Sequence, residues 1–282
     1  MLDKLAIVTD STADLSLSYY EKHHVEMVPL IVRFGDKAFK DWIEIGPRQF
    51  FERLGESEVL PKTSQPSVAQ FIEVYEKLAN RAEQIVSIHI SSELSGTVQA
   101  AQMAGDLVDV PVTVIDTKSA SLGTGLIVDA AVRARDAGLA AEEVIEKVRT
   151  VSEKSRIVFL VGTLKYLQLG GRIGKAQALV ASMLNIKPIL TLDNGIVAPY
   201  KKVKGISKAR AEMKQFFIDN TTGKGKLHIA FAHASCPFEL ERLKEVFGMG
   251  GLRVSSIIES EIGSVIGTYV GPGAFAVAFY ED

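Results

Sequence analysis

The sequence is poor in the residues that define several classes of protein. It has one cysteine, Cys236, among 282 residues, which excludes an intramolecular disulfide framework and a zinc site built from several cysteines. Its 32 basic and 34 acidic side chains give a net charge of −2, so it lacks the positive excess that binds nucleic acid or an anionic membrane. Asp3 and Thr9 interrupt the first apolar residues. We therefore expect a cytoplasmic protein without a signal peptide.

Long uninterrupted apolar runs are also scarce. The stretch 262–279 carries no charge, but four glycines and Pro272 interrupt it. A lipid-exposed helix would tolerate these residues poorly, so we expect two short buried strands around a turn and no integral membrane segment. The hydrophobic share of 47% is enough for a proper core, and the length favours two domains.

The first half of the chain alternates short apolar runs with amphipathic helical patterns. Strands are expected over residues 4–9, 26–32, 84–90 and 112–115, and helices over 67–82 and 140–151. Strand–helix alternation predicts a mainly parallel sheet covered by helices. We therefore predict an α/β fold whose N-terminal domain, residues 1–154, is an α/β/α sandwich.

The pattern changes after Ser155. Strands are expected over 156–161, 187–192, 196–202, 226–233, 254–259 and 274–280, and helices over 178–184, 207–220 and 237–247. Asp193-Asn194-Gly195 between two apolar runs is a strong hairpin signal. This predicts a C-terminal α+β domain, residues 155–282, with a mixed or antiparallel sheet that packs closely on the first domain.

Standard catalytic motifs are missing. The Gly174-Lys175 pair fails as a P-loop, because Leu169 stands where the first glycine belongs and Ala176 replaces the Ser or Thr. Residues 123–125 do not continue into a dinucleotide fingerprint, and the sequence has no G-x-S-x-G nucleophile elbow. The five histidines show no metal-ligand spacing. We therefore expect no metal and no cofactor.

Hydroxyl-rich turns follow several of the predicted strands. They are residues 9–12, 63–67, 91–97 and 117–119. The carboxyl ends of parallel strands meet at one rim, where ligands bind, and helix N-termini and hydroxyls there can hold an anion. Each turn alone is more simply a helix cap. Four together, with Gly96 and Gly123 allowing close approach, predict a site for an anionic group.

The second half offers a cation and apolar walls for such a site. Arg172 lies in a glycine-rich turn, and its forked donors match a carboxylate or phosphate. Taken alone, that motif is more simply a surface turn. The uncharged stretch 262–279, which contains Tyr269, would supply apolar surface. An anion-binding rim beside apolar walls predicts an amphiphile with one acidic head.

Seven motifs, in this order, resemble the DegV family. They are VTDST at 8–12, KTSQPS at 62–67, SIHISSELSGT at 87–97, VIDTKSASLGTG at 114–125, GGRIGKA at 170–176, IKPIL at 186–190 and IGSVIGTYVGPGA at 262–274. These proteins are the fatty-acid-binding subunits of bacterial fatty acid kinase. The resemblance therefore implies a carrier, not an enzyme, that holds a long-chain fatty acid such as palmitate or oleate between two domains. It would present the carboxylate to an ATP-dependent kinase subunit that forms the acyl phosphate, in lipid transport and fatty acid metabolism.

The resemblance also assigns residues. Thr63 and Ser95 would bind the carboxylate, and Arg172 would lie near it. Tyr269 stands where many relatives carry histidine, and tyrosine can donate to a carboxylate, whereas histidine titrates near neutrality. The supporting loop residues are Ser64, Ser92, Gly96 and Ser119.

Two other functions remain open. One is a small-molecule hydrolase or phosphotransferase with Ser95 or Ser92 as nucleophile, although no motif places a histidine or lysine as the activating base. The other is a regulatory lipid sensor that shares the pocket. The lysines of residues 201–208 are either a docking face for a kinase or a solvated surface.

Overall fold

The computed structural model of the protein describes residues 4–182, 186–248 and 253–282. Within these residues, strands form a four-stranded parallel sheet (β2-β1-β6-β7), a six-stranded mixed sheet (β10-β9-β8-β13-β11-β12) and a small antiparallel sheet (β4-β3-β5). The strands are β1 (Ala6–Asp10), β2 (Val25–Val28), β3 (Ile31–Phe34), β4 (Lys37–Lys40), β5 (Lys62–Ser64), β6 (Ile85–His89), β7 (Val112–Asp116), β8 (Arg156–Leu160), β9 (Lys187–Asp193), β10 (Ile196–Val203), β11 (Leu227–His233), β12 (Val254–Glu261) and β13 (Phe275–Glu281). The helices are α1 (Leu17–Lys22), α2 (Pro47–Glu56), α3 (Val68–Ala79), α4 (Thr97–Gly105), α5 (Leu122–Asp136), α6 (Ala141–Lys154), α7 (Lys165–Leu169), α8 (Ile206–Asp219), α9 (Pro237–Phe247) and α10 (Ser264–Val270), with 3₁₀ helices η1 (Ser11–Ala13) and η2 (Gly174–Ser182).

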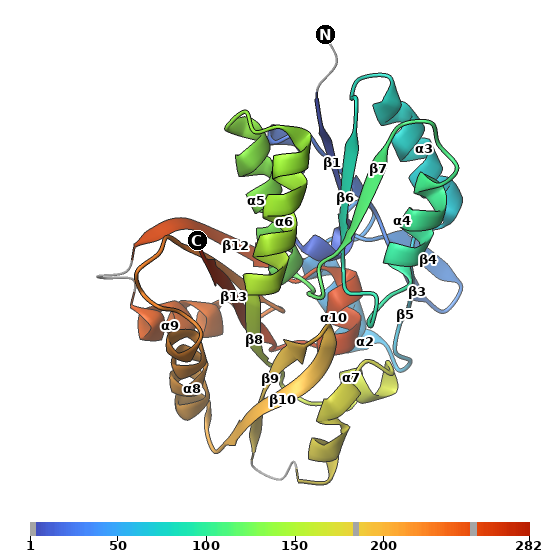
Figure 1. The fold of residues 1–282 in the computed structure, drawn as a ribbon. Helices are drawn as coiled ribbons and strands as arrows, with labels where there is room; N and C mark the ends of the chain where they lie inside the picture. The colour runs from blue at the N-terminus through green and yellow to red at the C-terminus, as the bar shows by residue number, and fades with distance from the viewer. Residues whose placement is uncertain (1–3, 183–185, 249–252) are drawn as a thin grey trace.

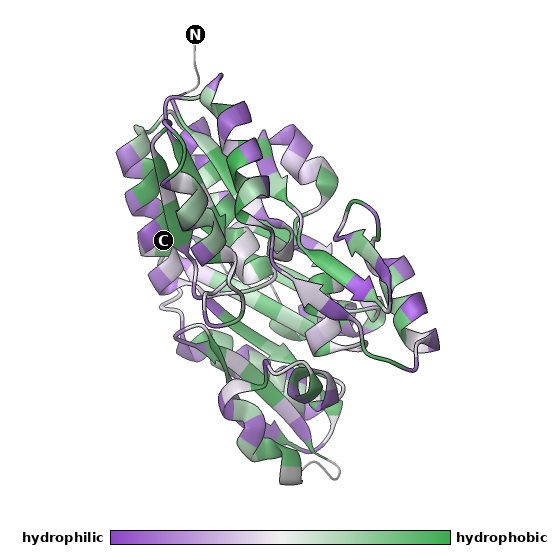
Figure 2. Ribbon diagram, turned by 90° about the vertical axis from the view of Figure 1, so that its right-hand side faces the viewer, coloured by the Kyte–Doolittle hydropathy of each residue, from purple (hydrophilic) through white to green (hydrophobic). Residues whose placement is uncertain are grey.

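The two larger sheets and their helices are stacked in layers (Figure 1). Helices α3 and α4 pack on the outer face of the parallel sheet, and α8 and α9 on the outer face of the six-stranded sheet. Helices α5 and α6 lie between the two sheets. Alternate strand residues face opposite layers: Ile7 points to the central layer and Val8 to α3 and α4. Figure 2 shows the interior strands largely green and the outer helices marked with purple.

Helix α5 fits between the sheets because the facing residues are small. Its Ala130 and Ala131 are buried, and the six-stranded sheet presents Ala230, Ala232 and Ala276 to the same central cluster. The helix contacts η1, β1 and β6 on one side and β11 and β13 on the other. One apolar cluster therefore runs from the parallel sheet to the six-stranded sheet.

The predicted fold class is confirmed. An α/β/α unit precedes a mixed sheet, and the chain forms the hairpin expected between β9 and β10. Asn194 and Gly195 at its turn have φ values of 50° and 83°, the left-handed pair that a type I′ turn requires. The division into two domains at residue 154 stays a prediction; α6 ends at Lys154 and β8 begins at Arg156.

Several predicted elements were wrong. The strand expected over 26–32 is two strands, β2 and β3, in different sheets, with Pro29 between them, because proline cannot donate to a ladder. The stretch 262–279 forms helix α10 before β13, not two strands. The small antiparallel sheet was not predicted. Of the helix expected over 178–184, η2 covers the residues to Ser182, and the rest lies outside the described residues.

The described residues contain neither a membrane-spanning helix nor a cluster of metal ligands. None of their helices combines the length and the apolar character needed to cross a membrane. They also contain no group of three or more His, Cys, Asp or Glu side chains arranged to hold a metal ion.

Candidate functional site

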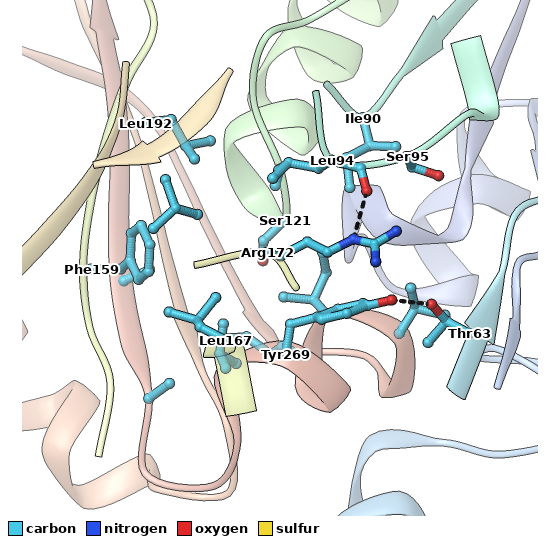
Figure 3. Close-up of a pocket in the computed structure, with 18 of the residues that line it drawn as sticks. Thr63, Ile90, Leu94, Ser95, Ser121, Phe159, Leu167, Arg172, Leu192 and Tyr269 are labelled. Atoms are coloured by element: carbon cyan, nitrogen blue, oxygen red, sulfur yellow. Dashed lines mark hydrogen bonds between the residues drawn. The ribbon is translucent and has the colours of Figure 1, made fainter. Parts of the chain in front are cut away.

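A cavity of about 390 Å³ lies between elements of the two halves of the chain. Its walls are mostly apolar: Ile90 and Leu94 come from the first half, and Phe159, Leu167 and Leu192 from the second (Figure 3). This volume is within the usual range of small-molecule pockets, about 300–1,000 Å³. The cavity can therefore enclose an apolar ligand of modest size.

Polar side chains gather at one end of this cavity. Thr63 and Ser95 lie on the side opposite Phe159 and Leu192 in Figure 3, and Arg172 and Tyr269 lie close to Thr63. We call this set (Thr63, Ser64, Gln65, Ser95, Arg172 and Tyr269) the head-group end. The structure thus brings together all four residues expected to bind the carboxylate.

Thr63 and Tyr269 meet across the head-group end. Thr63 is in β5, where it pairs with Val32 of β3, and Tyr269 is in α10. Their hydroxyl oxygens are 2.5 Å apart, and either can be the donor. Gly170 makes this possible, because a Cβ at that position would lie 2.4 Å from Cδ1 of the Tyr269 ring.

Arg172 connects three segments beside that pair. Its Nε donates to the Leu94 carbonyl at 3.1 Å and its Nη1 to the Gly170 carbonyl at 3.0 Å. The guanidinium carbon is 5.0 Å from the centre of the Tyr269 ring, a cation–π distance. The residue is exposed, so the charge lies where the cavity meets the surface.

Ser95 lies on the loop between β6 and α4. Its Oγ is 2.8 Å from Oγ1 of Thr97, the first residue of α4. Gly96 caps that helix, and a Cβ there would lie 2.2 Å from Oε1 of Gln65. The missing side chain therefore lets the segment after β5 approach Ser95.

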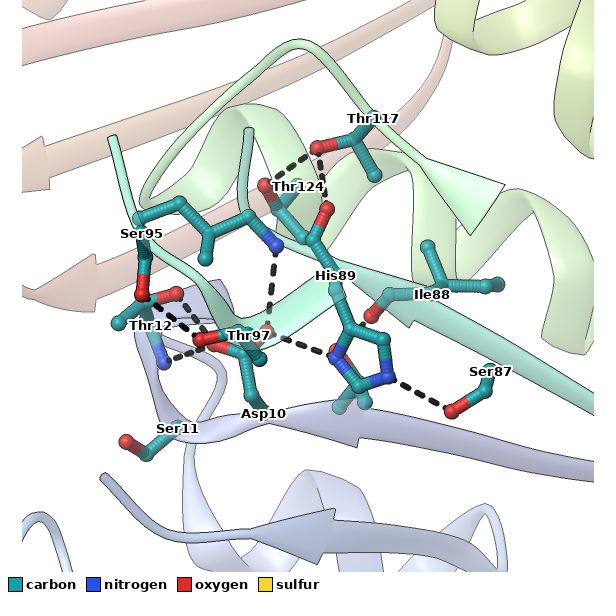
Figure 4. A network of polar contacts seen from close by, with 12 residues as sticks. Asp10, Ser11, Thr12, Ser87, Ile88, His89, Ser95, Thr97, Thr117 and Thr124 are labelled. Carbon is teal, nitrogen blue, oxygen red and sulfur yellow. Dashed lines mark hydrogen bonds and ion pairs between the residues drawn. The ribbon is translucent and has the colours of Figure 1, made fainter. Parts of the chain in front are cut away.

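The four hydroxyl-rich turns do not all reach the cavity. Residues 9–12 are fully buried in a different network (Figure 4). There Asp10 Oδ2 is 2.9 Å from His89 Nδ1 and accepts from the Ile90 amide at 3.1 Å, and His89 Nε2 is 2.7 Å from Ser87 Oγ. Thr117 donates to the His89 carbonyl at 2.8 Å. The turns at 9–12 and 117–119 therefore hold strand ends together, whereas the turns that contain Thr63 and Ser95 line the cavity.

The expected location of Thr63 needs a correction. It is in β5 of the small antiparallel sheet, and α3 begins at Val68 behind its cap Ser67. The rim of the parallel sheet therefore supplies Ser95 but not Thr63, because β5 is not a strand of that sheet.

The supporting loop residues are divided. Ser64 lines the cavity, whereas Ser92, Gly96 and Ser119 are not among its lining residues.

Ser92 belongs to a separate polar cluster. It donates to Asp116 at 2.5 Å and accepts from Lys118 at 3.1 Å. Partial burial raises the pKa of Asp116, but hydrogen bonds from Lys118 and Ser92 outweigh it and leave that pKa below its usual value. Lys118 is also paired with Asp116 at 2.8 Å.

Two carboxyl groups that the sequence analysis missed hold the start of α10. Asp14 Oδ1 accepts from the Gly263 amide at 2.9 Å, and Asp41 Oδ1 from the Ser264 amide at 2.8 Å. Both side chains are fully buried, and burial raises the pKa of both, that of Asp41 to about 6. Because α10 carries Tyr269, they position the head-group end. Isolated acidic residues in loops gave no signal of this role.

Comparisons with known proteins identify the family of the chain. The family model described as "Uncharacterised protein, DegV family" matches residues 4–282. The chain belongs to the DegV family. A DegV domain-containing protein of Streptomyces coelicolor is 38% identical over 279 residues, which cover 97% of each chain.

Solved structures of DegV proteins have the same fold. A DegV family protein from Thermus thermophilus, described by its fatty acid binding, is 36% identical and covers 99% of this chain and 100% of its own, with a TM-score of 0.94. DegV from Bacillus subtilis, described as a fatty acid binding protein, is 31% identical and covers 99% of both chains, with a TM-score of 0.91.

Proposed function

We propose that this DegV-family protein binds a long-chain fatty acid such as palmitate or oleate in the cavity, with its carboxylate at the head-group end. The observation that carries this proposal is an apolar cavity with two hydroxyl-bearing residues, Thr63 and Ser95, and the cation of Arg172 at one end. The descriptions of the Thermus thermophilus and Bacillus subtilis structures as fatty acid binding support it.

The energetics favour such a ligand. Each buried methylene contributes about 0.8 kcal/mol, so a chain of about fourteen contributes on the order of 10 kcal/mol before the costs of binding. The carboxylate needs donors, because a buried charge without partners is expensive. The Thr63 and Tyr269 hydroxyls share one hydrogen bond, which leaves one O–H of the pair for the ligand. Arg172 has five N–H donors and adds charge.

We propose further that the protein presents the carboxylate to a partner kinase and does not itself catalyse. Ser64 and Arg172 are exposed and Thr63 is partly exposed, so the head-group end faces the surface. A kinase subunit that carries ATP could therefore reach the carboxylate and convert it to an acyl phosphate.

The lysines at the end of β10, in the turn after it and at the start of α8 are the proposed docking face for this kinase. Lys201 is paired with Glu212 at 2.7 Å, and Lys202, Lys204 and Lys208 are exposed. Charge reversal in a Lys202→Glu, Lys204→Glu variant should slow association and weaken its salt dependence. Lys224→Glu, on the exposed loop before β11, is the matched control. Unaltered kinase coupling in the double variant would exclude this face.

Native mass spectrometry of the purified protein tests the binding proposal. A carried fatty acid should appear as added mass that is lost on delipidation and returns with oleate or palmitate. Absence of an adduct, together with no heat of binding for either fatty acid, would refute it. Trapping the acyl phosphate with hydroxylamine, in the presence of ATP and the kinase subunit, tests presentation separately.

A second candidate function is a small-molecule hydrolase or phosphotransferase with Ser92 or Ser95 as nucleophile. The observation that favours it is the hydrogen-bonded cluster of Ser92, Asp116 and Lys118. Turnover of a p-nitrophenyl ester distinguishes the two functions. A carrier should hydrolyse it no faster than its Ser92→Ala and Ser95→Ala variants do. A regulatory lipid sensor would share the cavity, and isolating the partner identifies it.

A further inference from the structure

Ile157 and Leu192 form a wall between the cavity described above, which we now call the acyl cavity, and a second cavity. Both residues line the acyl cavity, and both also line a neighbouring cavity of about 620 Å³. That second cavity has a charged lining: Asp116, Lys118, Arg149, Glu153, Arg156 and Asp193. The wall therefore separates an apolar space from a charged one.

Neighbouring strands hold this wall in place. Ile157 is in β8 and Leu192 in β9, and the Thr191 hydroxyl joins the two strands by donating to the Ile157 carbonyl at 2.7 Å. Leu192 also pairs with Val197 of β10. Ile157 is 7% exposed and belongs to the central apolar cluster. Leu192 is partly buried and packs against that cluster. A wall built on paired strands is more rigid than one built on a loop.

Leu192 of the wall lies at the far end of the cavity from the head group (Figure 3). Thr63 and Ser95 lie on one side in Figure 3, and Phe159 and Leu192 on the other. A fatty acid with its carboxylate at the head-group end therefore directs its terminal methyl group toward the wall.

We infer that Ile157 and Leu192 set the longest acyl chain that the protein binds with full affinity. This inference rests on the proposed function. Each methylene inside the apolar cavity should raise affinity about fourfold. A chain too long for the cavity would have to pass the wall into a space lined by exposed Arg149 and Arg156, where additional methylenes gain nothing. Affinity should therefore rise with chain length and then stop rising.

Titration calorimetry of delipidated protein with laurate, myristate, palmitate, stearate, arachidate and behenate tests this. Leu192→Ala frees the space of three carbons, so the length at which affinity stops rising should increase by about two carbons, and the longer chains should gain about tenfold relative to wild type. Leu192→Phe should shift that length in the opposite direction. Ile157→Val, a milder change, should shift it slightly toward longer chains.

Leu160→Ala is the matched control. Leu160 is 1% exposed and faces α8 from the other side of the six-stranded sheet, so this variant loses the same atoms as Leu192→Ala without touching the cavity. Its length profile should match that of wild type. If all the wall variants bind with the wild-type profile, the inference is wrong. If the wild type binds none of these fatty acids, the proposed function fails, and the inference with it.

Discussion

The hydroxyl groups of Thr63 and Tyr269 lie 2.5 Å apart although 206 positions separate them in the chain. One belongs to the small antiparallel sheet and the other to a helix near the C-terminus. Their hydrogen bond joins the two halves beside the cavity. The head-group end therefore exists only when both halves are folded and in contact.

Removing both hydroxyls of the first half should weaken fatty acid binding strongly. The Thr63→Ala, Ser95→Ala variant loses two hydrogen bonds to a charged group, together roughly 3–6 kcal/mol. Titration calorimetry with oleate measures the loss. Ser18→Ala, at an exposed serine of α1, should bind as wild type does, and equal affinity in the double variant would refute the assignment of the head group.

Replacing Arg172 distinguishes a role in binding the fatty acid carboxylate from a role in holding neighbouring loops. If the guanidinium contacts the carboxylate, Arg172→Ala should reduce the rise in melting temperature that oleate produces, since this rise follows ligand affinity. Arg172→Lys should restore it in part, because an ammonium cannot form a bidentate pair. The bonds to Leu94 and Gly170 also allow a purely bracing role. In that case the melting temperature of the ligand-free Arg172→Ala variant should fall, and the rise that oleate produces should be unchanged.

Gly170→Ala should disturb the site without removing a polar group. The new Cβ would lie 2.4 Å from the Tyr269 ring, so the ring or the turn at residue 170 must shift, and we expect this to disturb the hydrogen bond between Tyr269 and Thr63. We expect at least a tenfold loss of oleate affinity, equal to about 1.4 kcal/mol. Gly55→Ala in α2, where no atom lies within 4 Å of the new Cβ among the described residues, should leave affinity unchanged. Wild-type affinity in both variants would show that the ring position is unimportant.

Asp41 should make stability fall with rising pH. Burial raises its pKa from 3.8 to about 6, so between these values the native state binds protons more tightly than the unfolded state does. Its contribution is therefore complete below pH 4 and is lost as pH rises through 6. Relative to Asp41→Asn, the wild type should lose roughly 3 kcal/mol between pH 4 and 7. Urea unfolding of both proteins measures this, and a difference that does not change with pH would contradict it.

Local patterns were sufficient for much of the fold. Alternating apolar runs predicted the parallel strands, and Asn194-Gly195 predicted the β9–β10 hairpin, because these signals lie within a few residues. Helix α10 was missed because its start is held by Asp14 and Asp41, 249 and 223 positions away. Nothing near residue 264 in the sequence records those contacts.

The site was predictable in part for a similar reason. Hydroxyl patterns alone could not separate the turn at 9–12 from the turn containing Thr63. The difference is that the buried pair of Asp10 and His89 occupies the first turn, and this pairing spans 79 positions. Family resemblance supplied the choice of Thr63, Ser95 and Arg172 that the residue pattern left open.

The acyl cavity interrupts the same apolar cluster that surrounds α5. Ile157, Phe159 and Leu167 belong both to its walls and to that cluster, so the proposed ligand would complete the interior of the protein. A ligand that binds only the folded state stabilises it, so the proposed fatty acid would raise the free energy of unfolding and slow digestion of the chain by proteases.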